Sequence, residues 1–140
     1  QMAGQGQMPL IGIFDSAGSR ISMKGGEVGQ HGLARLLRNY SLYSGAIPRI
    51  ALVLGPCTGP VAKVPALADF MIMNEKTGFL WLGGPIESED AGTAEFHMTR
   101  SGQCDLVAES DEEAIDLCKD SSYDVISVDV NREALEQLTG

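Results

Sequence analysis

The sequence predicts an α/β protein whose strands pair in parallel. Short apolar runs alternate along the chain with segments of helical periodicity, and turn residues separate most of these segments. The chain has 140 residues, of which 44% are hydrophobic and 21% charged, a composition that suits one modest globular core and not a disordered coil. We therefore expect a single domain over residues 1–140.

The first half of the chain predicts two buried strands joined by a helix. Residues 9–14 form an apolar run that ends at a loop of small residues, and residues 49–54 form a second run that ends at the turn of residues 55–60. Between them, apolar residues recur at helical spacing over about residues 28–44, just before Gly45. Four residues of this helix are expected in the core: Leu33, Leu36, Leu37 and Tyr40.

The second half predicts further alternation of helix and strand. Its expected elements are a short helix over residues 61–69, strands over 70–73 and 79–82, a helix over 111–119, a strand over 124–130 and a last helix to about residue 138. Ser110 and Glu113 form a capping box that marks the start of the helix at residue 111. The strand over 124–130 rests on a regular alternation of apolar and polar residues.

Composition and charge argue against several classes of protein. The net charge is −9, and residues 87–140 hold fifteen of the nineteen acidic residues, so we expect no nucleic-acid partner. The more basic first half could bind a phosphorylated small molecule. The alternative is that the uneven surface charge serves no ligand. No apolar run reaches the roughly 18 residues of a membrane helix. Three widely spaced cysteines fit neither a disulfide framework nor a zinc knuckle, so we expect no metal and a reducing, cytoplasmic setting.

Two loops share one design, in which a buried strand is followed by small residues and then by a helix. They span residues 14–20 and residues 54–61. Small residues at the carboxyl end of a strand let a ligand approach the backbone, and the following helix start leaves N–H groups unpaired. Two such loops side by side could hold a carbonyl oxygen as it gains negative charge, as an oxyanion hole does. The spacing of these residues alone does not distinguish such a site from two turns with a purely structural role.

A series of short motifs runs through the chain. Residues 15–21 read Asp-Ser-Ala-Gly-Ser-Arg-Ile, and residues 54–59 read Leu-Gly-Pro-Cys-Thr-Gly. Further motifs lie at residues 44–50, 64–69, 82–85, 97–102 and 111–114. In their order and in nearly all of their spacings, these motifs resemble those of the acyl-CoA carboxyltransferases. That family comprises the transferase subunits of biotin-dependent acyl-CoA carboxylases and of some decarboxylases. The resemblance covers about residues 8–118.

The resemblance implies a crotonase-like fold, with this chain as part of a carboxyltransferase domain of the N-terminal type. It also implies transfer of a carboxyl group between an acyl-CoA and biotin, with the biotin held by a carrier protein and the subunits assembled as a homo- or hetero-oligomer. The backbone amides that would stabilise the thioester enolate are those of Ala17, Gly18, Gly59 and Val61. The side chains that would contact the CoA phosphates are Arg20, Lys24 and Lys63.

Three departures from the family leave the activity open. Pro60 stands where the family has a glycine; it either deletes an N–H donor or begins a helix at a position where that N–H is not needed. Residues 86–96 form a shorter connection than the family has, and the chain contains no counterpart of the family's second domain. Together these departures favour impaired transfer. Two alternatives remain, a crotonase-type acyl-CoA hydratase or isomerase and a non-catalytic subunit that binds acyl-CoA or completes an assembly.

Other polar residues near these motifs are expected to be structural. His97 and Arg100 lie in a polar turn, where hydrogen bonding within the fold is the favoured role. Cys57 has no histidine near it in the sequence and is expected to be a small buried packing residue. Asp15 and Asp69 are strand-end carboxylates and are expected to cap loops.

Overall fold

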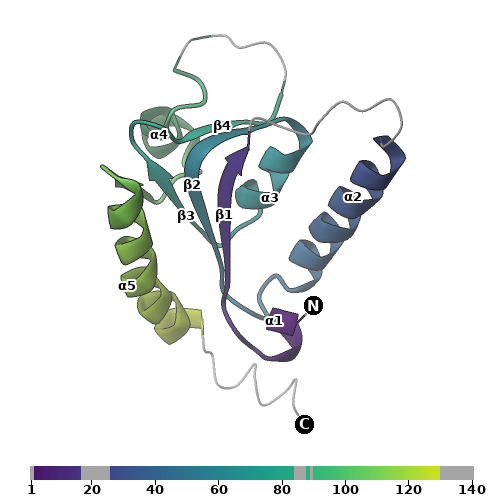
Figure 1. Ribbon diagram of the computed structural model, residues 1–140. Coiled ribbons are helices and arrows are strands. Elements are labelled where there is room, and N and C mark those ends of the chain that lie inside the picture. Colours follow the sequence, from purple (N-terminus) through teal and green to yellow (C-terminus); the bar gives the residue numbers. More distant parts are fainter. Residues whose placement is uncertain (1, 17–25, 84–87, 89, 130–140) are drawn as a thin grey trace.

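Five strands form one sheet in the part of the chain that the structure describes. This computed structural model describes residues 2–16, 26–83, 88 and 90–129 (Figure 1). The strands are β1 Leu10–Ser16, β2 Arg49–Thr58, β3 Phe70–Asn74, β4 Phe79–Trp81 and β5 Leu106–Ala108. Their order is β1-β2-β3-β5, and β4 pairs with the carboxyl end of β2. Each of these strand pairs is parallel, so the predicted α/β class is confirmed.

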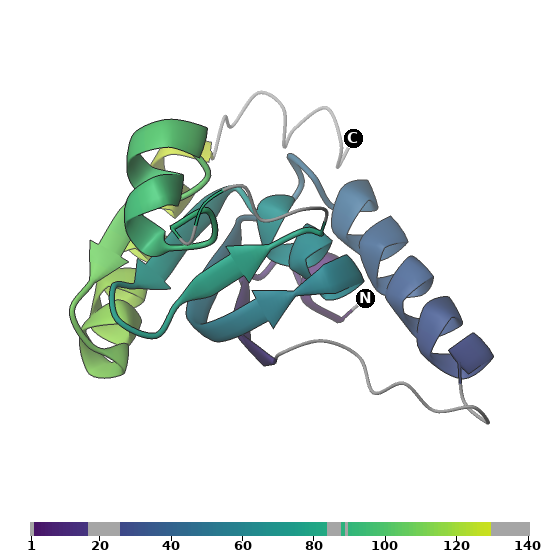
Figure 2. The same ribbon diagram turned by 90° about the horizontal axis from the view of Figure 1, so that it is seen from above.

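Helices lie on both sides of this sheet. They are α1 Met2–Gln5, α2 Gly26–Leu42, the 3₁₀ turn η1 Gly59–Ala62, α3 Lys63–Ala66, α4 Ala94–Phe96, the wide turn η2 His97–Ser101 and α5 Asp111–Asp129. Figure 2 shows α5 on one side of the sheet and α2 on the other. None of the helices described is both long enough and apolar enough to cross a membrane.

The core consists of two clusters, one on each face of the sheet. Ile50 and Leu52 of β2 pack with Ile72 of β3 towards α5, where Ala114 and Cys118 complete the first cluster. The alternate residues of β2 face the second cluster, to which β3, β4, η1 and α4 also contribute. Because both faces are covered, β2 is apolar without interruption from Ile50 to Leu54, and this run is the signal that predicts a buried strand.

Strand β2 changes partners along its length. Its first part pairs with β3 as far as Val53, and its last part pairs with β4 from Pro56 onwards. Against β1 the register shifts here, because residues 54–56 of β2 stand opposite Asp15 alone. A Cβ on Gly55 would come within 2.1 Å of Asp15 Oδ1, so a larger residue at this bend would require the exposed Asp15 side chain to move.

Helix α5 differs most from the prediction. It runs without interruption through Asp129, so the helix expected over residues 111–119 is longer and the strand expected over residues 124–130 is wrong. No glycine or proline between Lys119 and Asp129 ends the helix, and a short apolar alternation does not by itself distinguish a strand from a helix. The last expected helix, to residue 138, lies outside the described residues.

Smaller corrections concern the rest of the chain. Strand β2 continues to Thr58 through residues that were expected to form a turn, and the helix expected over residues 61–69 is replaced by η1 and α3, which end at Ala66. Leu36 is 43% exposed, and of the four α2 residues expected in the core only Tyr40 is fully buried. Elements α1, α4, η2 and β5 were not predicted, because segments of three to five residues carry no periodic signal.

Candidate active site

The carboxyl ends of β1 and β2 lie side by side at one edge of the sheet. Ser16, the last residue of β1, stands opposite Cys57 in the parallel register. The chain therefore leaves β1 beside the part of β2 that leads to Gly59, at the edge where α/β sheets commonly bind ligands. Four predicted site residues of the first loop lie outside the described residues: Ala17, Gly18, Arg20 and Lys24.

Gly59 follows directly after β2 and lies in the second predicted loop, residues 54–61. Its φ is +72°, a left-handed conformation that glycine adopts without the steric cost of a Cβ. Among the described residues other than its two chain neighbours, no atom comes within 4 Å of the place where that Cβ would be. The side chains of those residues therefore leave room for a ligand atom to approach the backbone at this position.

Pro60 lies in the first turn of η1, where one of the two interpretations from the sequence places it. Thr58 is the N-cap with an extended backbone, and Pro60 occupies one of the first two helical positions. At such a position its fixed φ suits the helix and its missing N–H costs no helical hydrogen bond. Val61 packs partly buried against the core, and the exposed Lys63 ends η1 by donating its N–H to the carbonyls of Pro60 and Val61.

Cys57 belongs to the core although it lies two residues before Gly59. Its side chain is 1% exposed and packs in a cluster with Ala62 and Leu80. Burial raises the pKa of the Cys57 thiol to about 11, so the thiol is protonated at neutral pH and is not a nucleophile there. The expected packing role is confirmed. Cys104 and Cys118 are also buried with free thiols, and burial raises the pKa of each.

His97 is held by hydrogen bonds within the fold, as expected. Its Nε2 lies 2.9 Å from the carbonyl oxygen of Leu80, which can only accept, so Nε2 carries the proton. The other ring nitrogen lies 2.8 Å from Ser101 Oγ and accepts from that hydroxyl. These contacts tie η2 to β4. Arg100 places its guanidinium 5.9 Å from the ring centre of Phe96, a surface contact of the same turn.

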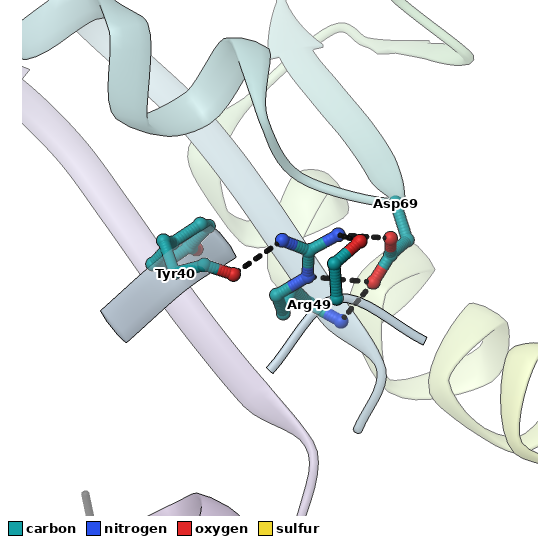
Figure 3. A network of polar contacts seen from close by, with 4 residues as sticks. Tyr40, Arg49 and Asp69 are labelled. Carbon is teal, nitrogen blue, oxygen red and sulfur yellow. Dashed lines mark hydrogen bonds and ion pairs between the residues drawn. The ribbon is translucent and has the colours of Figure 1, made fainter. Parts of the chain in front are cut away.

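A buried ion pair lies at the opposite, amino end of the sheet (Figure 3). Asp69 Oδ2 accepts from the backbone N–H and from Nε of Arg49 at 2.9 and 3.0 Å, and Asp69 Oδ1 pairs with Nη2. The remaining guanidinium nitrogen donates to the carbonyl of Tyr40 at 2.7 Å, and Ser44 Oγ lies 3.1 Å from Nη2. Arg49 is only 4% exposed. Asp69 is therefore an ion-pair partner that joins β2 to β3 and not a loop cap.

Sequence reasoning missed this pair although both residues stand in recognised motifs. The sequence did contain a signal for the ion pair: an arginine and an aspartate lie at the starts of two segments that were expected to be parallel strands. In the described part of the chain, no three His, Cys, Asp or Glu side chains gather as ligands of a metal ion would.

Comparison with known proteins places this architecture in a family. The family model described as "Carboxyl transferase domain" matches residues 1–125. A biotin-dependent acetyl-/propionyl-coenzyme A carboxylase beta5 subunit of Mycobacterium leprae is 37% identical over 122 residues, which is 80% of this chain and 22% of that protein. A propionyl-CoA carboxylase beta chain of Saccharopolyspora erythraea is 34% identical over 122 residues, with the same coverage.

Solved structures agree with these sequence relationships. Transcarboxylase 12S, solved with methylmalonyl-coenzyme A and methylmalonic acid bound, superposes with a TM-score of 0.77 at 30% identity. The match covers 85% of this chain and 25% of that one, so the chain spans about a quarter of the length of such relatives. The chain belongs to the carboxyl transferase domain family and has the crotonase-like α/β fold of its carboxyltransferases.

Proposed function

We propose that residues 1–140 are part of a carboxyltransferase domain of the N-terminal type, which moves a carboxyl group between biotin and an acyl-CoA. Family membership supports the reaction class, and the similar proteins are carboxylase and transcarboxylase subunits. One observation supports the choice of particular residues: the pairing of Ser16 with Cys57, which brings the carboxyl ends of β1 and β2 together at one edge of the sheet.

The amide of Gly59 is the main proposed donor of the second loop. Carboxyl transfer at an acyl-CoA passes through an enolate whose charge collects on the thioester oxygen, and a fixed N–H aimed at that oxygen lowers the barrier. The amide of Val61 is a second proposed donor. It is the weaker one, because a 3₁₀ turn directs each amide to the carbonyl three residues before it, which for Val61 is Thr58. The amides of Ala17 and Gly18 are proposed to complete the site.

Three basic residues are proposed to contact the phosphates of CoA. Lys63 is exposed and follows η1 directly, four residues after Gly59 in the sequence. Arg20 and Lys24 follow β1 in the sequence. Positive charge near the loops would draw a polyanionic ligand to this edge of the sheet.

The partners in this proposal are an acyl-CoA, a biotin carboxyl carrier protein and further subunits. When bound, carboxybiotin supplies the carboxyl group. The described residues leave space beside Gly59, which is compatible with a ligand close to its backbone. Exposed apolar side chains on β1 and α2 support association in a homo- or hetero-oligomer: Ile11, Ile13, Leu36 and Leu42. The free, buried cysteines support a reducing, cytoplasmic setting, and the proposal includes no metal, nucleic acid or membrane.

A pair of glycine variants tests this function. Gly59 and Gly45 have nearly the same φ, +72° and +74°, and open space around each, so alanine at either position should cost a similar strain of about 1–2 kcal/mol. Only Gly59→Ala should reduce biotin-dependent decarboxylation of malonyl-CoA, by about tenfold or more, because only it displaces a proposed donor. Gly45→Ala, at the amino end of the sheet, should keep the rate of the parent protein.

The assay begins with thermal-shift titrations of both variants and the parent with acetyl-, propionyl- and methylcrotonyl-CoA. Malonyl-CoA and free biotin then measure the transferase half-reaction. Equal loss of activity in Gly59→Ala and Gly45→Ala would contradict the site. Stabilisation by acyl-CoA without turnover would favour the non-catalytic binding subunit, and hydration of an enoyl-CoA would favour the hydratase.

Pro60→Gly separates the two roles of the proline. Because Pro60 lies in the first turn of η1, we expect the variant to decarboxylate malonyl-CoA within a few-fold of the parent rate. Its free energy of unfolding should fall by up to about 1 kcal/mol, since glycine has more freedom in the unfolded chain. A rise in rate of about 100-fold would instead mean that Pro60 deletes a donor that the reaction needs.

A further inference from the structure

The turn between β3 and β4 is fastened to the bend of β2. Thr77 Oγ1 donates a hydrogen bond of 2.5 Å to the carbonyl oxygen of Leu54. Leu54 stands where β2 changes partners: the pairing with β3 ends at Val53, and the pairing with β4 begins at Pro56. Leu54 has no partner in either of these ladders, so the Thr77 hydroxyl takes the place of a strand neighbour for its carbonyl.

Asn74 gives this turn a fixed shape. Its side chain is 4% exposed, and Oδ1 accepts from the N–H groups of Lys76 and Thr77 at 2.9 and 3.3 Å. Nδ2 donates to Asp111 Oδ1 at 2.6 Å, and the backbone oxygen of Asn74 accepts from Gly78 N at 2.9 Å. These hydrogen bonds connect the turn to the start of α5. They fix the conformation of the turn in which the Thr77 hydroxyl faces β2.

Gly59 lies five residues beyond Leu54 on the same stretch of chain. The intervening segment pairs with β4, which begins at Phe79, two residues after Thr77. A change in the angle of the bend at Leu54 would therefore move this segment and the backbone of Gly59 together. Cys57, in the middle of the segment, is buried in the core, so a movement of the segment would also disturb this packing.

We propose that Thr77 is a positioning residue whose hydroxyl holds β2 in its bend and thereby sets the position of the Gly59 backbone. The consequence for catalysis rests on the proposed function, in which the Gly59 amide serves the substrate. The effect of the Thr77 hydroxyl on the position of the Gly59 backbone does not depend on that function. Thr77 itself is exposed, so it can be replaced without opening the core.

The test compares Thr77→Val, which keeps the shape and removes the hydroxyl, with Thr77→Ser, which keeps the hydroxyl. Amide hydrogen exchange in the full chain is the first readout. Thr77→Val should speed exchange at Gly55 and Cys57 by about tenfold and leave Ile72 of β3 unchanged. It should also lower kcat for biotin-dependent malonyl-CoA decarboxylation at least about threefold with KM unchanged. Thr77→Ser should match the parent in both readouts.

Three results would overturn the proposal. They are unchanged exchange at Gly55 and Cys57 in Thr77→Val, an equal rise at Ile72, or a serine variant as impaired as the valine variant. The exchange readout does not depend on turnover. A parent protein without decarboxylation would therefore contradict the proposed function alone, and hydrogen exchange would still decide the role of Thr77.

Discussion

Replacing Gly78 with alanine is expected to lower the free energy of unfolding by about 3 kcal/mol or more. A Cβ at this position would come within 2.6 Å of the carbonyl oxygen of Asn74 and 2.7 Å of that of Val53. Both are backbone atoms of paired strands, which cannot turn aside as a flexible side chain can. Either the turn must leave β2, or the pairing of β2 with β3 must open.

Gly32→Ala is the matched control for this change. Gly32 lies within α2, and apart from the helix's own backbone and the two chain neighbours no atom of the described residues comes within 4 Å of the position where its Cβ would be. Alanine should therefore stabilise the protein by about 0.5–1 kcal/mol, because it favours the helix and restricts the unfolded chain. Urea unfolding of both variants measures the difference. A Gly78→Ala protein as stable as its parent would mean that the turn does not pack against β2 in solution.

The strands of this fold could be predicted where burial on both faces leaves a long apolar run. β2 is the clearest case, and the parallel pairing followed from the alternation of strand and helix. The start of α5 was also predicted, and the structure confirms its cap: Ser110 Oγ accepts from the N–H of Glu113. The end of α5 could not be predicted, because the residues after Lys119 contain no helix breaker and suit a strand as well.

The candidate site could be predicted in part for a similar reason. Neighbouring parallel strands bring the loops at their carboxyl ends together whatever the side chains are, and the pairing of Ser16 with Cys57 follows that rule. The bend at Leu54 and its hydrogen bond from Thr77 could not be predicted. Both depend on a register shift and on a partner 23 residues away, which no local pattern of residues encodes.

Asp69→Asn is expected to lower the free energy of unfolding by about 3 kcal/mol. The substitution keeps the shape of the side chain but leaves the guanidinium of Arg49, which is 4% exposed, without its counter-charge. Because the Asp69 side chain is 28% exposed, the loss should fall at the lower end of the range for breaking a buried ion pair. Urea unfolding of the variant and its parent measures it.

A double-mutant cycle with Arg49→Met isolates the pair from its surroundings. Arg49→Met alone should also destabilise the protein, because the Asp69 carboxylate loses its two guanidinium donors, keeping only the backbone N–H of residue 49, and the Tyr40 carbonyl loses its donor. The double variant removes both charges, so it should lose less stability than the two single variants together, with a coupling energy of about 1–3 kcal/mol. Strictly additive losses would mean that Arg49 acts through Tyr40 and Ser44 instead, and that the charge of Asp69 contributes little to joining β2 and β3.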